Sequence, residues 1–237
     1  KGLQNKKLVL FSARTSSFHD EKTESCRNSK INNQTLGIKF LVSKKYNALR
    51  IGKNEIEKIN FSDQNIIDYA ISSERSDFLD VYLGSKCEFM ISSDSGINQL
   101  ADLFRKPILI IDHYYCLSFE RYASKVIALP KKFRDIDTGK LVGFVEAYQK
   151  LLINNNPDNP SEVNKLGYEV IDNNEFEVKE AIESMLSLIN NSFHLNEIFE
   201  KQKKFWDNLE INFGYKPNNQ VIICPNFYSK NIDLFEN

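Results

Sequence analysis

The chain has 237 residues, of which 41% are hydrophobic and 27% are charged, a composition typical of a globular protein with a sizeable core. Its 31 basic and 32 acidic residues leave a formal net charge of -1, which argues against a nucleic-acid partner. No apolar run is long enough for a transmembrane segment, and four widely spaced cysteines without a Cys-x-x-Cys pair argue against a disulfide framework or a zinc site.

Short apolar runs alternate with segments of helical spacing along the first part of the chain. This alternation is typical of a parallel sheet that is covered by helices on both faces. We expect strands at 7–12, 47–52 and 65–70, and helices at 35–42 and 77–83.

The segment 89–111 is the most informative part of the sequence. A buried strand at 89–92 is followed by the small polar turn 92–96, by a helix with Ile97, Leu100, Ala101 and Phe104 on one face, and by a second buried strand at 108–111. Such a turn either binds phosphate against the start of the helix or is an ordinary loop with a capped helix.

The second half of the chain continues the pattern and adds helices. We expect a strand at 126–129, a polar loop at 154–160, a strand at 168–171, and helices at 174–190 and 196–209. The sequence therefore predicts an α/β fold, a Rossmann-like doubly wound parallel sheet over residues 1–172. Residues 173–237 are expected to form a C-terminal helical extension that packs on or beside this domain.

Four polar turns follow predicted strands, at 12–17, 50–53, 72–77 and 92–96. Because the carboxyl ends of parallel strands meet at one edge of a sheet, these turns are expected to surround one crevice. Their arginines, hydroxyls and glycine are suited to a diphosphate group. Taken singly, Arg14 and Arg50 also fit surface ion pairs.

The order of several segments resembles a family of bacterial glycosyltransferases. The segments are Arg27-Asn28, Arg50-Ile51-Gly52, 67–70, 76–83, 87–96 and Phe104-Arg105-Lys106-Pro107, with further matches at 129–134 and 202–206. The resemblance spans almost the whole chain and implies the C-terminal, donor-binding half of a GT-B enzyme, with an N-terminal acceptor domain outside this chain. More distantly, the turn at 94–96 is similar to the donor loops of heptosyltransferases and UDP-sugar epimerases. Arg14 is placed like the diphosphate-binding arginine of fucosyltransferase-like enzymes. The chain departs from the family at Thr15, where an acid is expected.

The resemblance implies an inverting glycosyltransferase that moves a sugar from a nucleotide-diphosphate sugar to a hydroxyl of a glycan or lipid-linked acceptor. Such an enzyme would act in bacterial surface polysaccharide or glycoconjugate synthesis, in the cytoplasm or peripherally at the inner face of the membrane. No cofactor and no metal are expected, because arginines would neutralise the departing diphosphate.

Donor-binding roles follow for eight residues. Arg14 and Arg50 would neutralise the pyrophosphate, and the backbone of Ser95 and Gly96 would contact it. Asp77 would bind a donor hydroxyl or cap the helix that follows. The full set expected at the donor site is Arg14, Arg50, Asp77, Ser92, Ser93, Asp94, Ser95 and Gly96.

Two further loops have two alternative assignments each. The loop 112–115 would contact the base or the ribose, although His113 equally fits an exposed loop histidine. His19, Asp20 and Glu21 are the local candidates for a general base, and a solvated loop explains them equally well.

Two other functions remain open. A nucleotide-sugar epimerase would use the same scaffold without an acceptor, and a non-catalytic domain would bind a nucleotide sugar or a partner without transfer. A dehydrogenase is disfavoured because no Gly-x-Gly-x-x-Gly follows the first strand.

Overall fold

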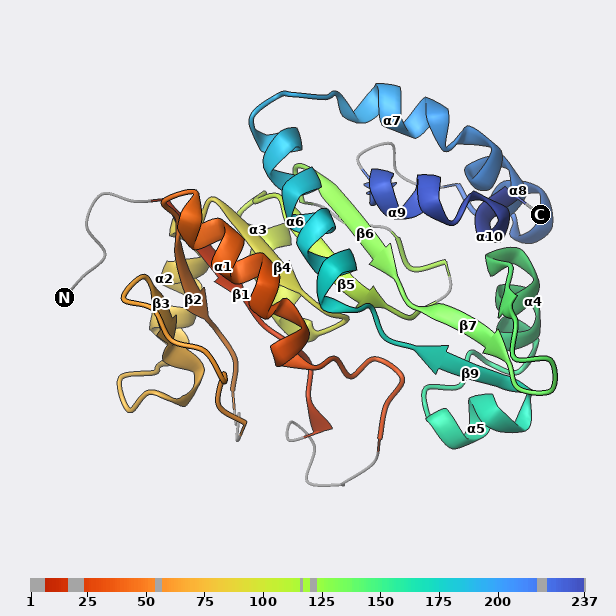
Figure 1. The fold of residues 1–237 in the computed structure, drawn as a ribbon, viewed down its shortest axis with the longest axis horizontal. Helices are drawn as coiled ribbons and strands as arrows, with labels where there is room; N and C mark the ends of the chain where they lie inside the picture. Colours follow the sequence, from red (N-terminus) through yellow and green to blue (C-terminus); the bar gives the residue numbers. More distant parts are fainter. Residues whose placement is uncertain are drawn as a thin grey trace.

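The central layer is a seven-stranded parallel sheet, seen in a computed structural model that describes residues 7–16, 24–53, 57–115, 117–119, 123–216 and 221–236 (Figure 1). The strand order is β10-β6-β5-β4-β1-β2-β3, and every neighbouring pair is parallel. The predicted doubly wound α/β fold is therefore confirmed. The strands are β1 (Leu8–Phe11), β2 (Asn47–Arg50), β3 (Ile66–Asp68), β4 (Phe89–Ser92), β5 (Ile108–His113), β6 (Val126–Pro130) and β10 (Val221–Ile223).

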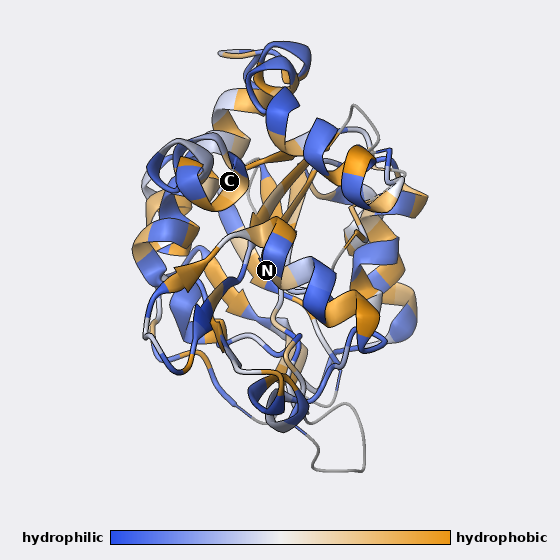
Figure 2. Ribbon diagram, turned by 90° about the vertical axis from the view of Figure 1, so that its right-hand side faces the viewer, coloured by the Kyte–Doolittle hydropathy of each residue, from blue (hydrophilic) through white to orange (hydrophobic). Residues whose placement is uncertain are grey.

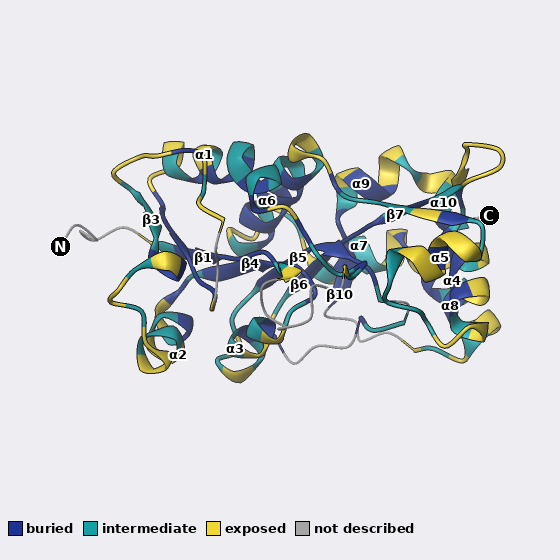
Figure 3. Cartoon of the chain, turned by 90° about the horizontal axis from the view of Figure 1, so that it is seen from below, coloured by how far each residue is buried: buried dark blue, intermediate teal, exposed yellow. Residues whose placement is uncertain are grey.

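The middle strands are apolar because both of their faces are covered. Every residue of β4, β5 and β6 is buried, as Figure 3 shows, and strands in the interior of the molecule are coloured mainly as hydrophobic in Figure 2. Continuous Val, Ile and Leu runs are typical of such strands, which explains why these elements were predictable.

Helices lie on both sides of the sheet (Figure 3). α1 (Thr35–Ser43) and α6 (Glu175–Ile189) cover one face, and α2 (Asp77–Lys86) and the short α3 (Gln99–Leu103) cover the other. The α1–α6 contact is close, because a Cβ atom on Gly37 would lie 2.3 Å from Cδ1 of Ile182. Short 3-10 turns occur at Ile31–Gln34, Tyr69–Ile71 and Gly96–Asn98.

A second, three-stranded antiparallel sheet follows β6. It consists of β7 (Lys132–Asp135), β8 (Leu141–Val142) and β9 (Tyr168–Ile171), and is accompanied by α4 (Phe144–Ile153) and α5 (Pro160–Lys165). The sequence predicted β9 but not the hairpin β7–β8 or α4. The hairpin strands are short and partly polar, and therefore lack the apolar signal of the main sheet.

The C-terminal part contains the expected helices and one unexpected strand. The helix predicted at 196–209 is divided at Gln202 into α7 (Leu195–Lys201) and α8 (Lys203–Phe213). β10 then pairs with β6, so residues 173–237 contribute an edge strand to the main sheet as well as helices. The chain ends with α9 (Pro225–Lys230) and α10 (Ile232–Glu236). Over the described ranges, no helix has the length and apolar character needed to cross a membrane.

Candidate functional site

A cavity of about 270 Å³ lies where the strand order reverses, between β1 and β4. Chain order runs from β1 to β3 on one side of this point and from β4 to β6 on the other. Open α/β sheets bind ligands at such a point, outside the carboxyl ends of the strands. The cavity is lined by loops after β1, β2 and β4 and by α2 with its preceding loop, namely Ser12, Ala13, Arg14, Thr15, Gly52, Lys53, Arg75, Asp80, Ser95, Gly96 and Ile97.

Ser92 and Ser93 join the loops of β1 and β4 beneath the cavity. The hydroxyls of Ser12 and Ser92 are 2.8 Å apart, and the backbone N–H of Arg14 donates to Oγ of Ser93 at 2.8 Å. Ser92 and Ser93 are both fully buried and do not line the cavity. They therefore hold the turn in place and, unlike the donor-site role expected for them, do not reach the cavity.

Asp94 connects the same turn to the end of β5. Its carboxylate accepts a hydrogen bond from the backbone of Tyr114 at 2.6 Å and lies 2.7 Å from Nδ1 of His113. His113 is 2% exposed and belongs to β5, so its interpretation as an exposed loop histidine is wrong. Of the loop 112–115, only Tyr115 retains partial exposure.

Ser95 and Gly96 are the residues of the turn 92–96 that line the cavity. Apart from Gly96 itself and its two chain neighbours, no atom of the described residues lies within 4 Å of the position that a Cβ on Gly96 would occupy, so there is open space beside this stretch of backbone. The expected helix is a 3-10 turn followed by the five-residue α3. A helix this short has a weak dipole, so the attraction of an anion depends mainly on side chains.

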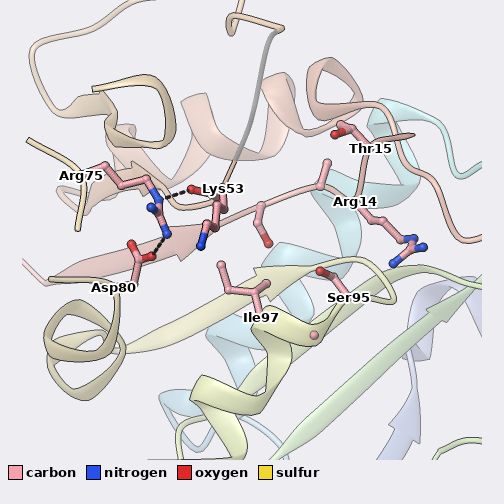
Figure 4. Close-up of a pocket in the computed structure, with 11 residues that line it drawn as sticks. Arg14, Thr15, Lys53, Arg75, Asp80, Ser95 and Ile97 are labelled. Carbon is pink, nitrogen blue, oxygen red and sulfur yellow. Dashed lines mark hydrogen bonds and ion pairs between the residues drawn. The ribbon is translucent and has the colours of Figure 1, made fainter. Parts of the chain in front are cut away.

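Arg14 lies at one side of the cavity, next to Ser95 (Figure 4). Its Nε is buried and has no hydrogen-bond partner among the described residues. Burial and the neighbouring charge of Arg27 lower the pKa of Arg14. Arg14 also borders a second cavity of about 210 Å³, whose lining residues are Arg14, Thr15, Ser16, Asn28, Ser29, Lys30 and Asp172.

Arg50 lies elsewhere, so the structure does not bring it to the cavity as expected. Its side chain is buried, donates from Nη1 to the carbonyl of Glu57 at 2.5 Å, and lies 3.3 Å from Oδ2 of Asp68. The cause is strand register, because Arg50 on β2 is paired with Asp68 on β3. Lys53, three residues later, supplies the cation that lines the cavity from this loop.

Asp77 is 80% exposed and does not line the cavity either. It neither caps α2 nor faces the cavity, because Oγ of Ser76 accepts the capping hydrogen bond from the N–H of Leu79. Instead Asp77 lies 3.1 Å from Nη2 of Arg75.

Arg75 and Asp80, which were not expected at the site from the sequence, form an ion pair on the side of the cavity opposite Arg14 (Figure 4). Arg75 is held by a 2.7 Å hydrogen bond from Nε to the carbonyl of Gly52. Burial raises the pKa of Asp80, against the opposing effect of Arg75. The sequence contains a signal for this pair. Arg75 comes just before Ser76, the N-cap of α2, and Asp80 lies one turn into the same helix.

A buried network supports the second cavity. Asp112 exchanges hydrogen bonds with Asn173, at 2.8 Å and 2.6 Å, and accepts one from the hydroxyl of Ser29. Burial raises the pKa of Asp112 to about 6. Lys131 donates to Asp172 at 2.6 Å and to the carbonyl of Asn28 at 2.7 Å, which fixes both walls of the cavity.

Acidic residues do not gather into a metal site in the described part of the chain, where no group of three or more His, Cys, Asp or Glu side chains could hold an ion. An Asp-x-Asp sequence does occur at 135–137, in the turn between β7 and β8. There Asp135 accepts a hydrogen bond from the N–H of Thr138 at 2.7 Å and does not line the cavity. His19, Asp20 and Glu21 lie outside the described residues.

No protein-family model matches the chain, and no curated protein matches it. Among solved structures, the chain is similar to a UDP-GlcNAc 2-epimerase from Neisseria meningitidis bound to UDP-GlcNAc, with a TM-score of 0.34 and 18% identity. The match covers 78% of this chain and 44% of the epimerase chain, so the chain spans less than half the length of that protein.

Proposed function

We propose that the cavity between β1 and β4 binds the diphosphate of a nucleotide sugar, and that the chain is the donor-binding part of a glycosyltransferase. The observation that carries the proposal is the environment of Arg14. Its buried Nε has no partner among the described residues, and it borders the cavity whose wall includes the open backbone of Gly96. A guanidinium in this situation is suited to bind a phosphate group through two parallel hydrogen bonds.

Lys53 is a second cation for the same ligand. It is 54% exposed, and its ion pair with Asp77 is long, at 4.0 Å. A phosphate that enters the cavity can therefore attract this ammonium group at little cost. Asp80, on the same side of the cavity, takes the place of Asp77 as the acid available to donor hydroxyls.

The chemistry of transfer follows from the departing charge. When the bond between the sugar and the diphosphate breaks, negative charge develops on the diphosphate, and fixed cations lower the barrier. Arg14 supplies such a charge, in keeping with the proposed metal-independent and inverting reaction. The acceptor is a hydroxyl of a glycan or lipid-linked molecule, bound by a separate domain, and His19, Asp20 and Glu21 remain candidates for the general base.

The first experiment measures binding of UDP, GDP, ADP, CMP and TDP by thermal shift and titration calorimetry. We expect one nucleoside diphosphate to bind, and Arg14→Gln to weaken it by about 1 to 3 kcal/mol, the value of a charge-assisted hydrogen bond. Arg134→Gln is the matched control, because Arg134 is an exposed arginine that pairs with Glu169 on the second sheet. If none of the nucleotides binds, the proposal is wrong.

Gly96→Val tests the turn itself. The position has open space and an ordinary φ, so the variant is expected to keep the stability of the wild type and to lose nucleotide binding. Wild-type affinity in this variant would show that the ligand does not approach the turn.

The sugar chemistry is tested with the corresponding nucleotide sugar. Transfer to an added acceptor, with release of nucleoside diphosphate, is the expected result. Formation of an epimer without any acceptor would identify an epimerase instead. Binding without either reaction would indicate a non-catalytic domain.

A further inference from the structure

We propose that Arg27 is the second phosphate-binding arginine of the site and makes it selective for a diphosphate over a single phosphate. The inference rests on the nucleotide site proposed above and deepens it. It assigns to Arg27 the role that the sequence suggested for Arg50.

The backbone around Arg27 is fixed by contacts to the loop that follows α4. The N–H of Cys26 donates to the carbonyl of Asp158 at 2.6 Å, and the hydroxyl of Ser25 donates to the carboxylate of the same residue at 2.7 Å. The N–H of Arg27 donates to Oγ of Ser25 at 3.1 Å. The base of the Arg27 side chain is thereby held in place before any ligand binds.

The guanidinium is positioned by an aromatic ring. Cζ of Arg27 lies 4.6 Å from the centroid of the Tyr115 ring, within the range of a cation–π contact. Tyr115 follows Tyr114, whose N–H donates to the carboxylate of Asp94. Asp94 belongs to the turn that ends at Gly96, so Arg27 is connected through the ring to the loop that lines the main cavity.

The segments that carry Arg27 and Arg14 are adjacent, because the N–H of Ser29, two residues after Arg27, donates to the carbonyl of Arg14 at 2.9 Å. The charge of Arg27 contributes to the lowered pKa of Arg14, after burial. Each guanidinium has a buried Nε for which the described residues provide no hydrogen-bond partner. The charge of Asp158 opposes this shift at Arg14, but one carboxylate balances only one of the two guanidinium charges.

Two guanidiniums that share one carboxylate keep a net positive charge and two buried Nε donors without partners among the described residues, which favours binding of a further anion. A single phosphate can satisfy one guanidinium fork, while a diphosphate has enough oxygens to satisfy two. The second cavity, bordered by Arg14 and by Asn28 next to Arg27, leaves room on this side of Arg14 for the second phosphate. The ligand class that fits is therefore a diphosphate.

Inorganic pyrophosphate and orthophosphate test the proposal without reference to the base, by titration calorimetry on the whole chain. The wild type is expected to bind pyrophosphate at least about tenfold more tightly than orthophosphate. Arg27→Gln should weaken pyrophosphate binding by roughly 10- to 100-fold, the equivalent of one charge-assisted hydrogen-bond pair, and orthophosphate by less than about threefold. Arg27→Lys, which keeps the charge but not the planar fork, should show an intermediate loss.

Arg134→Gln serves again as the control and should leave both affinities unchanged, and thermal melts establish that each variant is folded. Equal losses for the two ligands, or wild-type pyrophosphate affinity in Arg27→Gln, would overturn the role of Arg27. A wild type that binds pyrophosphate no more tightly than orthophosphate would overturn it too. Failure of the proposed function is distinguished by the nucleotides themselves, which would then not bind the wild type at all.

Discussion

Two arginines that follow neighbouring strands show how strongly position decides the role of a residue. Arg14 follows β1, and its backbone N–H donates to Oγ of Ser93, the residue after the neighbouring strand β4, while its Nε has no hydrogen-bond partner among the described residues. Arg50 ends β2 and is paired in register with Asp68. The first arginine therefore keeps a buried Nε without a partner among the described residues, whereas the second is part of the core.

Arg50→Met tests this structural role. Removal of the guanidinium takes the donor from the carbonyl of Glu57 and leaves the carboxylate of Asp68 without its cation, with the N–H of Ile59 at 3.3 Å as its remaining donor among the described residues. We therefore expect a loss of about 3 to 5 kcal/mol in the free energy of unfolding. Denaturant titration measures it, and the exposed pair of Arg134 with Glu169 provides a control variant that should change stability by less than about 1 kcal/mol. A stable Arg50→Met protein that fails to bind nucleotide would instead return Arg50 to the binding site.

Residue types at the site could be predicted better than their partners. The turn 92–96 and Arg14 could be recognised because small polar residues and an arginine directly follow apolar strands. The pairing of Arg75 with Asp80, and of Asp94 with His113, depends on how loops far apart in the sequence fold against each other. The pattern of a single sequence indicates the local spacing of apolar residues, and hence helices and strands, but it does not indicate which distant side chains pair.

At the scale of elements, long apolar patterns predicted helices and strands reliably, whereas short patterns did not. α6, with its capping box of Asn174 and Glu177, begins and ends within one residue of the predicted range. β10 has three residues, too few for a period to be recognised. On the side of β10 that faces away from β6, the backbone of Ile223 bonds to a side chain. Nε2 of Gln202 donates to the carbonyl of Ile223 at 2.7 Å, and Oε1 of Gln202 accepts a hydrogen bond from the N–H of Ile223 at 2.9 Å.

Gln202→Met should therefore destabilise the C-terminal part of the sheet. The variant keeps the side-chain volume but leaves the buried N–H and C=O of Ile223 unpaired, at an expected cost of about 2 to 4 kcal/mol in the free energy of unfolding. Hydrogen exchange on β10 and denaturant titration measure the effect. Gln149→Met is the control, because Gln149 bonds Asn212 at an exposed position, and its change should stay within about 0.5 kcal/mol. Equal stability of the two variants would show that Gln202 does not support the strand.

At the scale of the whole molecule, the position of the site follows from topology. The order β3-β2-β1-β4-β5-β6 places the ends of β1 and β4 side by side, and their loops diverge to opposite sides of the sheet. The sequence could indicate an alternation of strands and helices, and hence a sheet with a crevice at its carboxyl edge. It could not indicate that β7 and β8 leave the main sheet or that the chain returns to it at β10.

The pairing of β10 with β6 leads to a prediction of how the molecule unfolds. Residues 191–237 provide β10, which covers the edge of β6, and Phe205 and Phe235, whose rings lie 5.0 Å apart. Phe235 also packs on Phe144 of α4, with ring centroids 4.5 Å apart. A chain that stops at residue 190 would expose this aromatic cluster and the edge of β6. We therefore expect it to lose the cooperative thermal transition of the full chain.

Circular dichroism and calorimetry measure that transition, and addition of the segment 191–237 as a separate peptide provides the control, because it should restore part of the lost cooperativity. Restoration would show that the contacts, rather than chain length, are responsible. A truncated chain that unfolds in one sharp transition, within a few degrees of the full chain, would contradict the expectation. In that case the first 190 residues would fold as an independent unit, and β10 would be an addition to a sheet that is already stable.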